Sequence, residues 1–315
     1  MTHKVIYFDG GGSGIRAGAN VDGIRTTVKN FTGFSHGEVD LVDYLADVVS
    51  KFANEIGDDI SRAILATATL PADDARYEAI ASLVFQKSDI QELWICSDSV
   101  SSCAAAISGD GVVIASGTGI TALAVGKSRS MLHSLSGDGY LIGDEASAYW
   151  IGKMGLSAAL RARDGRDQSS GAAQLLEVAC AYFGTEPYYL PHIVHQQERA
   201  VHGIANFALQ VSELAATGNT RAQEIIEAAG DEVALIASTA HRECGGGADF
   251  QVALVGGVLA PDTLVYQSAV KKIENLGLKI HTSGKNPLDG AEILSMQSDA
   301  GVFAPMIKVF KVGCK

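Results

Sequence analysis

The feature that most constrains the fold of this chain is a pair of glycine-rich turns, each of which follows a short apolar run rich in β-branched residues. The first is Asp9-Gly10-Gly11-Gly12-Ser13-Gly14, and the second is Ser116-Gly117-Thr118-Gly119. Because glycine has no side chain, a strand that ends in such a turn can present bare N–H groups and a hydroxyl to a phosphate. The turns lie about one domain apart, which predicts a nucleotide held between two halves of the chain.

Neither turn fits the two commonest phosphate-binding patterns. A Walker motif would continue with Gly-Lys-Ser/Thr, and a dinucleotide fingerprint would continue into a helix. Residues 15–21, the Asp22-Gly23 turn and residues 24–28 instead predict a β-hairpin. A tight hairpin loop without a ligand is the alternative interpretation. The aspartate that leads the first turn favours the functional one.

The length of 315 residues exceeds that of a typical single domain, so two domains are expected. We predict an N-terminal domain at residues 1–107 and a C-terminal domain with a helical insertion at residues 108–291. The C-terminal segment, residues 292–315, could pack back on the first domain. The five cysteines are widely spread without a CxxC pair, so neither a disulfide framework nor a structural zinc site is indicated.

The net charge of −12 argues against non-specific binding to nucleic acids or anionic membranes, because both require a basic surface. The first strand begins by Val5, which leaves no room for a secretory leader, and no apolar run reaches the roughly 18 residues that a membrane span needs. The sequence therefore predicts a cytoplasmic protein with a small-molecule substrate.

The order of predicted elements repeats along the chain. The first hundred residues are predicted to form three strands, a helix, a strand, a helix and a last strand at residues 93–96. The pattern then restarts with strands at residues 111–115, 121–125 and 131–135 around the second glycine turn, which indicates an internal duplication. Helices dominate the second half, at about residues 145–163, 172–183, 202–217 and 220–242. A strand at residues 250–255 then ends in Gly256-Gly257, a third junction that could hold the adenosine end of a nucleotide.

A possible metal site lies on a short helical stretch. His192, His195 and Glu198 have a spacing that could place zinc ligands on one helix face. The polar neighbours of these residues favour a solvated helix face instead.

The chemistry of phosphoryl transfer matches the polar residues of the turns. This reaction needs a cradled polyphosphate, a magnesium ion that offsets charge, and a base for the accepting hydroxyl. Asp9, Ser13, Thr118 and Asp98 could fill these roles. Asp98 ends a predicted strand just before a helix, where it could act as a general base. Its alternative role is that of a helix N-cap, and the two roles can coexist.

The arrangement of these motifs resembles the N-acetylglucosamine kinase and BadF/BadG/BcrA/BcrD ATPase family, within the sugar kinase, actin and Hsp70 superfamily. The resemblance spans about residues 5–295 and keeps the family's order of motifs. It rests on Asp9-Gly-Gly-Gly-Ser13, Ser97-Asp98, Gly111 to Gly119, Gly137 to Gly152, Val255-Gly-Gly-Val258 and Pro287-Leu-Asp-Gly-Ala291.

The resemblance implies an α/β fold of two ribonuclease-H-like (actin-like ATPase) domains with a nucleotide cleft between them, which close over the substrates and exclude water. It implies ATP and Mg²⁺ as cofactors, with Asp98 as the base and Asp9 holding the metal through water. By the same resemblance, the nucleotide-binding residues would be Gly11, Gly12, Ser13, Gly117, Thr118, Gly256 and Gly257. The sugar-binding residues would be Thr118, Gly119, Gly137, Asp138, Gly139 and Asp144.

Several positions depart from the family pattern. Ser13-Gly14 stands where the family has Thr-Lys or Thr-Arg, so a positive charge beside the phosphates is missing, and Arg16 is a possible replacement. The sugar loop of the family corresponds to Ser136-Gly137-Asp138-Gly139 here. Asp138 replaces the aromatic residue of that loop and could pair with a free amine. The small-residue turn after the fourth strand reads Thr67-Ala68-Thr69, and the early substrate asparagine has no clear counterpart near residues 35–37.

The function predicted first is an ATP-dependent kinase that phosphorylates a primary hydroxyl of an amino sugar such as glucosamine or N-acetylglucosamine. One alternative is an ATPase that activates a partner enzyme, as the cluster-bearing dehydratase activators of the family do. Another is a non-catalytic sensor of a sugar or nucleotide. A homodimer is possible because many relatives are dimers.

Overall fold

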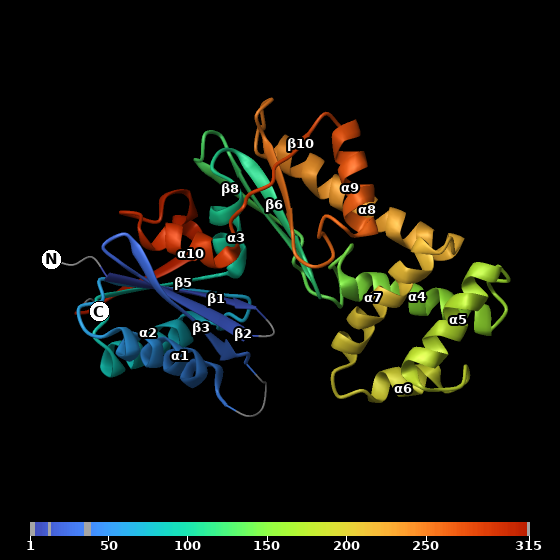
Figure 1. Cartoon of the computed structure of the whole chain (residues 1–315), viewed down its shortest axis with the longest axis horizontal. Helices are drawn as coiled ribbons and strands as arrows, with labels where there is room; N and C mark the ends of the chain where they lie inside the picture. Colours follow the sequence, from blue (N-terminus) through green and yellow to red (C-terminus); the bar gives the residue numbers. More distant parts are fainter. Residues whose placement is uncertain (1–3, 12–13, 35–38, 314–315) are drawn as a thin grey trace. The chain divides into compact units, whose positions relative to one another are not determined.

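The protein consists of two compact α/β units (Figure 1). The computed structural model describes residues 4–11, 14–34 and 39–313. The first unit comprises residues 1–108, 129–132 and 283–315, and the second comprises residues 109–128 and 133–282. The C-terminal segment therefore belongs to the first unit although it follows the second in the sequence.

The first unit is built on a six-stranded sheet of order β11-β5-β4-β1-β2-β3. The predicted hairpin is confirmed: β1 (Lys4–Gly11), β2 (Gly14–Val21) and β3 (Ile24–Thr32) pair antiparallel. The β2–β3 turn is tight because Asp22 and Gly23 both have positive φ, at 52° and 85°. On the other side of β1, β4 (Arg62–Thr67) and β5 (Glu92–Cys96) run parallel to it, and β11 (Ile307–Lys311) pairs antiparallel with β5.

Helices cover both faces of this sheet (Figure 1). Alternate residues of β1 point to opposite faces, so Ile6 and Phe8 join a core with α1 (Leu41–Ile56) and α2 (Asp74–Lys87). The other face packs against α3 (Asp98–Ala106) and α10 (Pro287–Ser295). A 3₁₀ helix, η1 (Gly301–Met306), leads into β11.

The second unit repeats the strand arrangement of the first. Its five-stranded sheet has the order β10-β9-β6-β7-β8. The strands are β6 (Gly111–Ser116), β7 (Ile120–Gly126), β8 (Met131–Leu135), β9 (Gln251–Val255) and β10 (Lys279–Ile280). As β1 does in the first sheet, β6 pairs antiparallel with the next strand in sequence and parallel with a strand on its other side. The predicted duplication is confirmed.

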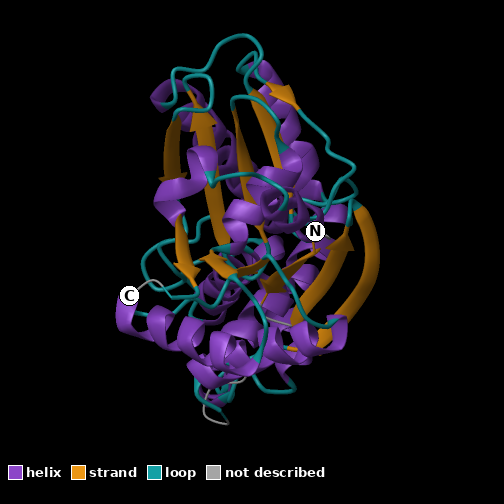
Figure 2. Cartoon of the chain, turned by 90° about the vertical axis from the view of Figure 1, so that its left-hand side faces the viewer, coloured by secondary structure: helices purple, strands orange, loops and turns teal. Residues whose placement is uncertain are grey.

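Helices form most of the rest of the second unit (Figure 1), and Figure 2 distinguishes the helices of the whole chain, in purple, from its strands, in orange. They are α4 (Ala148–Arg163), α5 (Ser170–Phe183), α6 (Leu190–Gln196), α7 (Ala200–Ala216), α8 (Thr220–Glu243) and α9 (Leu264–Asn275). The prediction that α4 starts at Glu145 is wrong by one turn, because the Ser147 side chain caps the helix by accepting from the Trp150 N–H at 3.1 Å.

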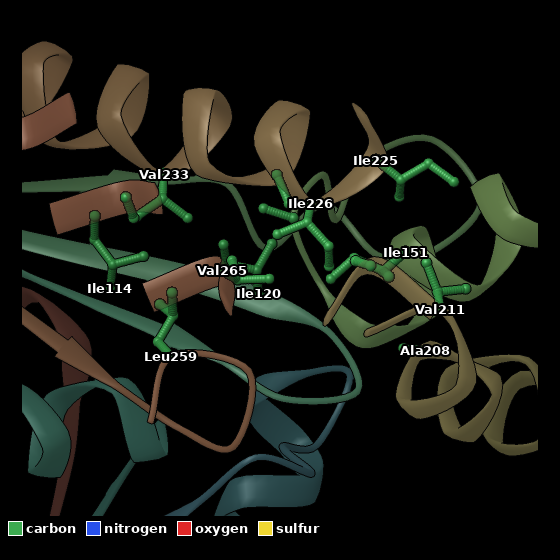
Figure 3. Packing of buried hydrophobic residues seen from close by; sticks show 14 of the residues in the cluster. Ile114, Ile120, Ile151, Ala208, Val211, Ile225, Ile226, Val233, Leu259 and Val265 are labelled. Atoms are coloured by element: carbon green, nitrogen blue, oxygen red, sulfur yellow. The ribbon is translucent and has the colours of Figure 1, made fainter. Parts of the chain in front are cut away.

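The core of the second unit lies between the sheet and these helices. Figure 3 shows Ile114 of β6 and Ile120 of β7 packed with Val233 and Ile226 of α8, and the same cluster extends to Ile151 of α4. This packing fixes the second glycine turn, which joins β6 to β7. Among the described residues, no helix is both long enough and apolar enough to cross a membrane.

Candidate functional site

Asp9 lies near the end of β1 in the first unit, where its carboxylate is nearly buried, with 8% of the residue exposed. Arg16 of β2 donates a hydrogen bond to Asp9 Oδ2 at 2.6 Å, and Ser101 Oγ of α3 contacts Oδ1 at 3.4 Å. The hairpin register explains the first contact, because Asp9 and Arg16 are directly opposite residues of β1 and β2.

Asp98 is the first residue of α3, directly after β5. The interpretation of Asp98 as the N-cap is wrong, because Ser97 occupies that position and its Oγ accepts from the Ser99 N–H at 3.2 Å. The Asp98 carboxyl therefore does not occupy the capping position, and its Oδ1 accepts a hydrogen bond from Ser97 Oγ at 3.2 Å. Burial raises its pKa above the ordinary aspartate value, and the nearby charge of Asp9 raises it further, while a hydrogen bond from Ser97 opposes the rise. The structure thus brings Asp9 and Asp98 together in the first unit.

The second glycine turn is held by the start of α4. The N–H groups of Ala148 and Tyr149 donate to the carbonyls of Gly117 and Thr118, at 2.9 and 3.2 Å. Beneath the turn, the Ser116 hydroxyl donates to the Ala146 carbonyl at 2.9 Å. The turn is therefore fixed by hydrogen bonds on both sides.

The third strand-to-glycine junction packs against this turn. The Val258 N–H donates to the Ser116 carbonyl at 3.1 Å. Gly256 has a φ of +96°, and a Cβ there would lie 2.3 Å from the Ser116 carbonyl oxygen, so only glycine fits. A Cβ at Gly117 or Gly257 would meet nothing within 4 Å. Both therefore present bare backbone to open space, as a phosphate-binding turn requires.

A cavity of about 550 Å³ opens beside these glycines within the second unit. Gly117, Thr118 and Gly257 are among its lining residues, and its wall is largely apolar. Its other lining residues, which sequence analysis missed, include Asn206, Leu209, Ser212 and Glu213 of α7, and Asp262 and Thr263 before α9. The cavity has the size and the mixture of apolar wall and few polar groups typical of a site for a small molecule such as a nucleoside.

The loop between β8 and α4 carries the predicted sugar-binding residues. Gly137 and Gly139 both have a φ of 85°, and the non-glycine residues Ser136, Asp144 and Ala146 also have positive φ values. Such a concentration of left-handed residues stores backbone strain, which is common at binding sites.

Asp144 joins this loop to the second glycine turn. Its residue is 7% exposed, and a Cβ on Gly119 would lie 2.8 Å from Asp144 Oδ2. Burial raises the pKa of Asp144, as do the charges of Glu145 and Asp138, whereas the N–H groups of Ile120 and Gly139 oppose the rise. Residues 117–119, 137–139, Asp144 and 256–257 thus form one cluster in the second unit.

The remaining predicted positions either lie outside the described residues or are not part of these two clusters. Gly12, Ser13 and residues 35–37 lie outside the described residues, and Gly11 is paired with Gly14 in the β1–β2 hairpin. His192 and His195 lie on α6, and the described part of the chain contains no group of three or more His, Cys, Asp or Glu side chains suited to a metal.

The residues present fit both groups that the resemblance implies. The hard carboxylate oxygens of Asp9 suit Mg²⁺, and the guanidinium at 2.6 Å marks the position as one where a cation is stable. The cavity with its bare glycine backbone suits a nucleotide.

The comparisons with known structures agree on the fold. The chain is similar to a putative N-acetylglucosamine kinase from Chromobacterium violaceum, with a TM-score of 0.68 and 19% identity over 94% of this chain and 99% of that one. A putative N-acetylglucosamine kinase from Porphyromonas gingivalis gives 0.67 and 15%, over 92% and 98%. A ROK family glucokinase from Streptomyces griseus, solved with glucose and AMPPNP, gives 0.57 and 16%, over 94% and 100%.

These likenesses confirm the predicted α/β fold of two ribonuclease-H-like domains. No curated protein matches the sequence. The model of the BadF/BadG/BcrA/BcrD ATPase family, however, matches residues 9–292, which is most of the chain. The protein belongs to the BadF/BadG/BcrA/BcrD ATPase family.

Proposed function

We propose that this protein is an ATP-dependent kinase that transfers the terminal phosphoryl group to a primary hydroxyl of an amino sugar. The observation that carries the proposal is Asp98, a carboxylate fixed at the start of α3 with its pKa raised by burial and by Asp9. Raised basicity suits a group that must take a proton from a hydroxyl. Family membership supports ATP as the phosphoryl donor.

Each predicted residue would have one role in the transfer. Asp98 would accept the proton of the attacking hydroxyl at its carboxylate. Asp9 would hold Mg²⁺ through water, and the ion would offset the phosphate charge. Gly117, Thr118, Gly256 and Gly257 would bind the nucleotide, with Gly11, Gly12 and Ser13 on its phosphates. Thr118, Gly119, Gly137, Asp138, Gly139 and Asp144 would bind the sugar.

The base of the nucleotide would lie on the apolar wall of the 550 Å³ cavity, which Leu209 of α7 helps to form. Leu209 is 66% exposed and should be covered when the base binds. Leu209→Ala should therefore weaken ADP binding about fivefold, as expected for the loss of about 1 kcal/mol of apolar burial. Isothermal titration calorimetry measures the change. Leu235→Ala on α8, where the leucine is 57% exposed and outside the cavity lining, should leave ADP affinity unchanged.

The charge of the sugar loop favours a substrate with a free amine. Asp138 stands in the loop, and the neighbouring Asp144 and Glu145 are also acidic. A carboxylate can form a charge-assisted hydrogen bond with an ammonium group, whereas an N-acetyl group offers no such charge.

Asp138→Asn should thus lower kcat/KM for glucosamine by about tenfold or more, the effect of losing one charge-assisted pair. The same variant should leave kcat/KM for N-acetylglucosamine within about twofold of wild type. Glu145→Gln is the control, since it removes one charge from the same loop. Equal losses on both sugars in Asp138→Asn would contradict amine recognition by this residue.

The activator alternative is disfavoured by the cysteines. A cluster shared between subunits needs accessible thiolates. Cys96 and Cys103 are buried inside the first unit, with 1% and 0% of each residue exposed, so neither thiol can reach a cluster shared with another subunit.

The experiment that tests the proposal is Mg²⁺-dependent release of ADP from ATP in the presence of glucosamine, N-acetylglucosamine, N-acetylmuramic acid or glucose. Sugar-stimulated release that is lost in Asp98→Asn would support the kinase. Release without sugar would favour the ATPase activator, and no release would favour the sensor.

A further inference from the structure

Arg16 has no role in the proposed reaction, although its side chain contacts the carboxylate proposed to hold the metal ion. It stands on β2 directly opposite Asp9 of β1, and its Nη2 donates to Asp9 Oδ2 at 2.6 Å. The side chain of Arg16 is 44% exposed, whereas that of Asp9 is only 10% exposed. A cation that reaches in from solvent is thus paired with a nearly buried carboxylate.

We propose that Arg16 is a positioning residue whose ion pair with Asp9 prevents free divalent metal ions from binding there. The ion pair breaks, and Asp9 becomes available to a metal ion, only when a nucleotide polyphosphate binds Arg16. This inference rests on the proposed function, because it takes Asp9 as the metal-binding carboxylate. It adds a role for a residue that lies outside the glycine turn itself.

The ion pair accounts for the closed state. Burial makes an unpaired carboxylate costly, and the guanidinium is the cation that offsets the charge of Asp9 here. The remaining contact to its carboxylate recorded within the described residues, from Ser101 Oγ, is long at 3.4 Å. A free metal ion would meet a neutralised carboxylate and a neighbouring positive charge, and would have to displace the guanidinium. Mg²⁺ also gives up its water reluctantly. Its affinity for the site alone should therefore be low.

A polyphosphate changes this balance. Its oxygens can accept two parallel hydrogen bonds from one guanidinium. The contact to Asp9 uses only one nitrogen of Arg16, so a polyphosphate offers the guanidinium the better partner. The exposed, long side chain of Arg16 can leave Asp9 while the strand backbone stays paired. The carboxylate would then be available to hold Mg²⁺ through water, in place of the guanidinium. One cation is exchanged for another, so the charge of Asp9 is offset in both states.

The test uses Mn²⁺ as the probe, with free ion measured by electron paramagnetic resonance, on the full chain with and without ADP. Arg16→Gln should bind Mn²⁺ alone about tenfold more tightly than wild type, and should bind ADP in the presence of Mn²⁺ about tenfold more weakly. A residue with a purely structural role would move both affinities in the same direction. Arg16→Lys keeps a positive charge and should exclude free Mn²⁺ almost as well as wild type.

Two outcomes would overturn the proposal. If Arg16→Gln binds Mn²⁺ alone no more tightly than wild type, while Asp9→Asn loses metal-dependent ADP binding, the metal site stands and the role of Arg16 is wrong. If adding Asp9→Asn to Arg16→Gln leaves Mn²⁺ binding unchanged, Asp9 is not the metal site and the proposed function loses that residue. Circular dichroism verifies folding. Should Arg16→Gln not fold, the charge-preserving Arg16→Lys still decides the question, since loss of metal exclusion in that variant would contradict the electrostatic argument.

Discussion

Asp98→Asn should lower turnover by at least about a hundredfold and leave nucleotide affinity nearly unchanged. Asparagine has almost the same size and keeps an acceptor oxygen, but it cannot take a proton from the sugar hydroxyl. The Ser97 cap on α3 does not depend on the carboxylate, so the helix start is preserved. Steady-state kinetics with the preferred sugar, combined with ADP titration, separates the two effects.

The raised pKa of Asp98 gives this prediction a second readout. A base must be ionised, so kcat/KM of the wild type should fall as the pH drops through the pKa of Asp98, at a higher pH than an ordinary aspartate would give. Asp9→Asn removes a negative charge that raises this pKa and should shift any residual activity profile to lower pH.

The raised pKa of Asp98 also predicts that the Asp98→Asn variant is at least as stable as the wild type. Because the pKa of Asp98 is higher in the folded than in the unfolded state, this residue favours folding at a pH below its unfolded-state pKa. That contribution is lost as the pH rises through the folded-state pKa. At neutral pH the buried charge therefore costs stability. Asp98→Asn should unfold at an equal or higher temperature than wild type at pH 7, as expected when a functional group is kept at the expense of stability.

A matched control exists in the first unit. Asp74 is the first residue of α2, as Asp98 is of α3, but it is exposed and pairs with Lys308 at 2.8 Å. Asp74→Asn should leave turnover within about twofold of wild type, since exposed ion pairs contribute little. Equal activity of Asp98→Asn and wild type would remove Asp98 from the role of base.

Local signals account for how well the sequence predicted the fold. The Asp22-Gly23 turn and the alternating strands around it encode the first hairpin within a few residues, and Asp73 caps α2 as its place before that helix indicates. Strand β11 was not predicted, because its partner β5 is more than half the chain away in sequence and a short edge strand has no local mark. Pairing of that kind depends on tertiary contacts.

In the candidate site, too, some residues are marked by the local sequence and others are identified only by the tertiary structure. Glycines that must be bare, such as Gly256 against Ser116, stand out in the sequence because they follow strands. The α7 residues of the cavity do not, since an alanine-rich and leucine-rich helix face has the same pattern whether it lines a cavity or packs in a core. Asn206 and Glu213 become candidates only when the cavity itself is known.

Gly290→Ala should cause the largest loss of stability among these variants, because α10 crosses α3 at this glycine. A Cβ at Gly290 would lie 1.8 Å from the Ser101 carbonyl oxygen and 2.9 Å from the Ala105 nitrogen, both in the backbone of α3. Backbone cannot rotate away as a side chain can, so the helices must separate. Such overpacking costs about 3 kcal/mol, and the better helix propensity of alanine offsets about 1 kcal/mol of it.

The separation should also reach the site, since α3 carries Asp98 and the Ser101 hydroxyl that contacts Asp9. We therefore expect Gly290→Ala to lose about 2 kcal/mol in urea unfolding and to lower kcat by about tenfold or more, because small displacements of a catalytic group are costly. Gly284→Ala, where a Cβ would meet nothing within 4 Å, should change neither quantity appreciably. If Gly290→Ala lost stability but kept full turnover below its unfolding transition, the position of α3 would not control the reaction, and Asp98 would have to act from a less constrained position than the structure gives it.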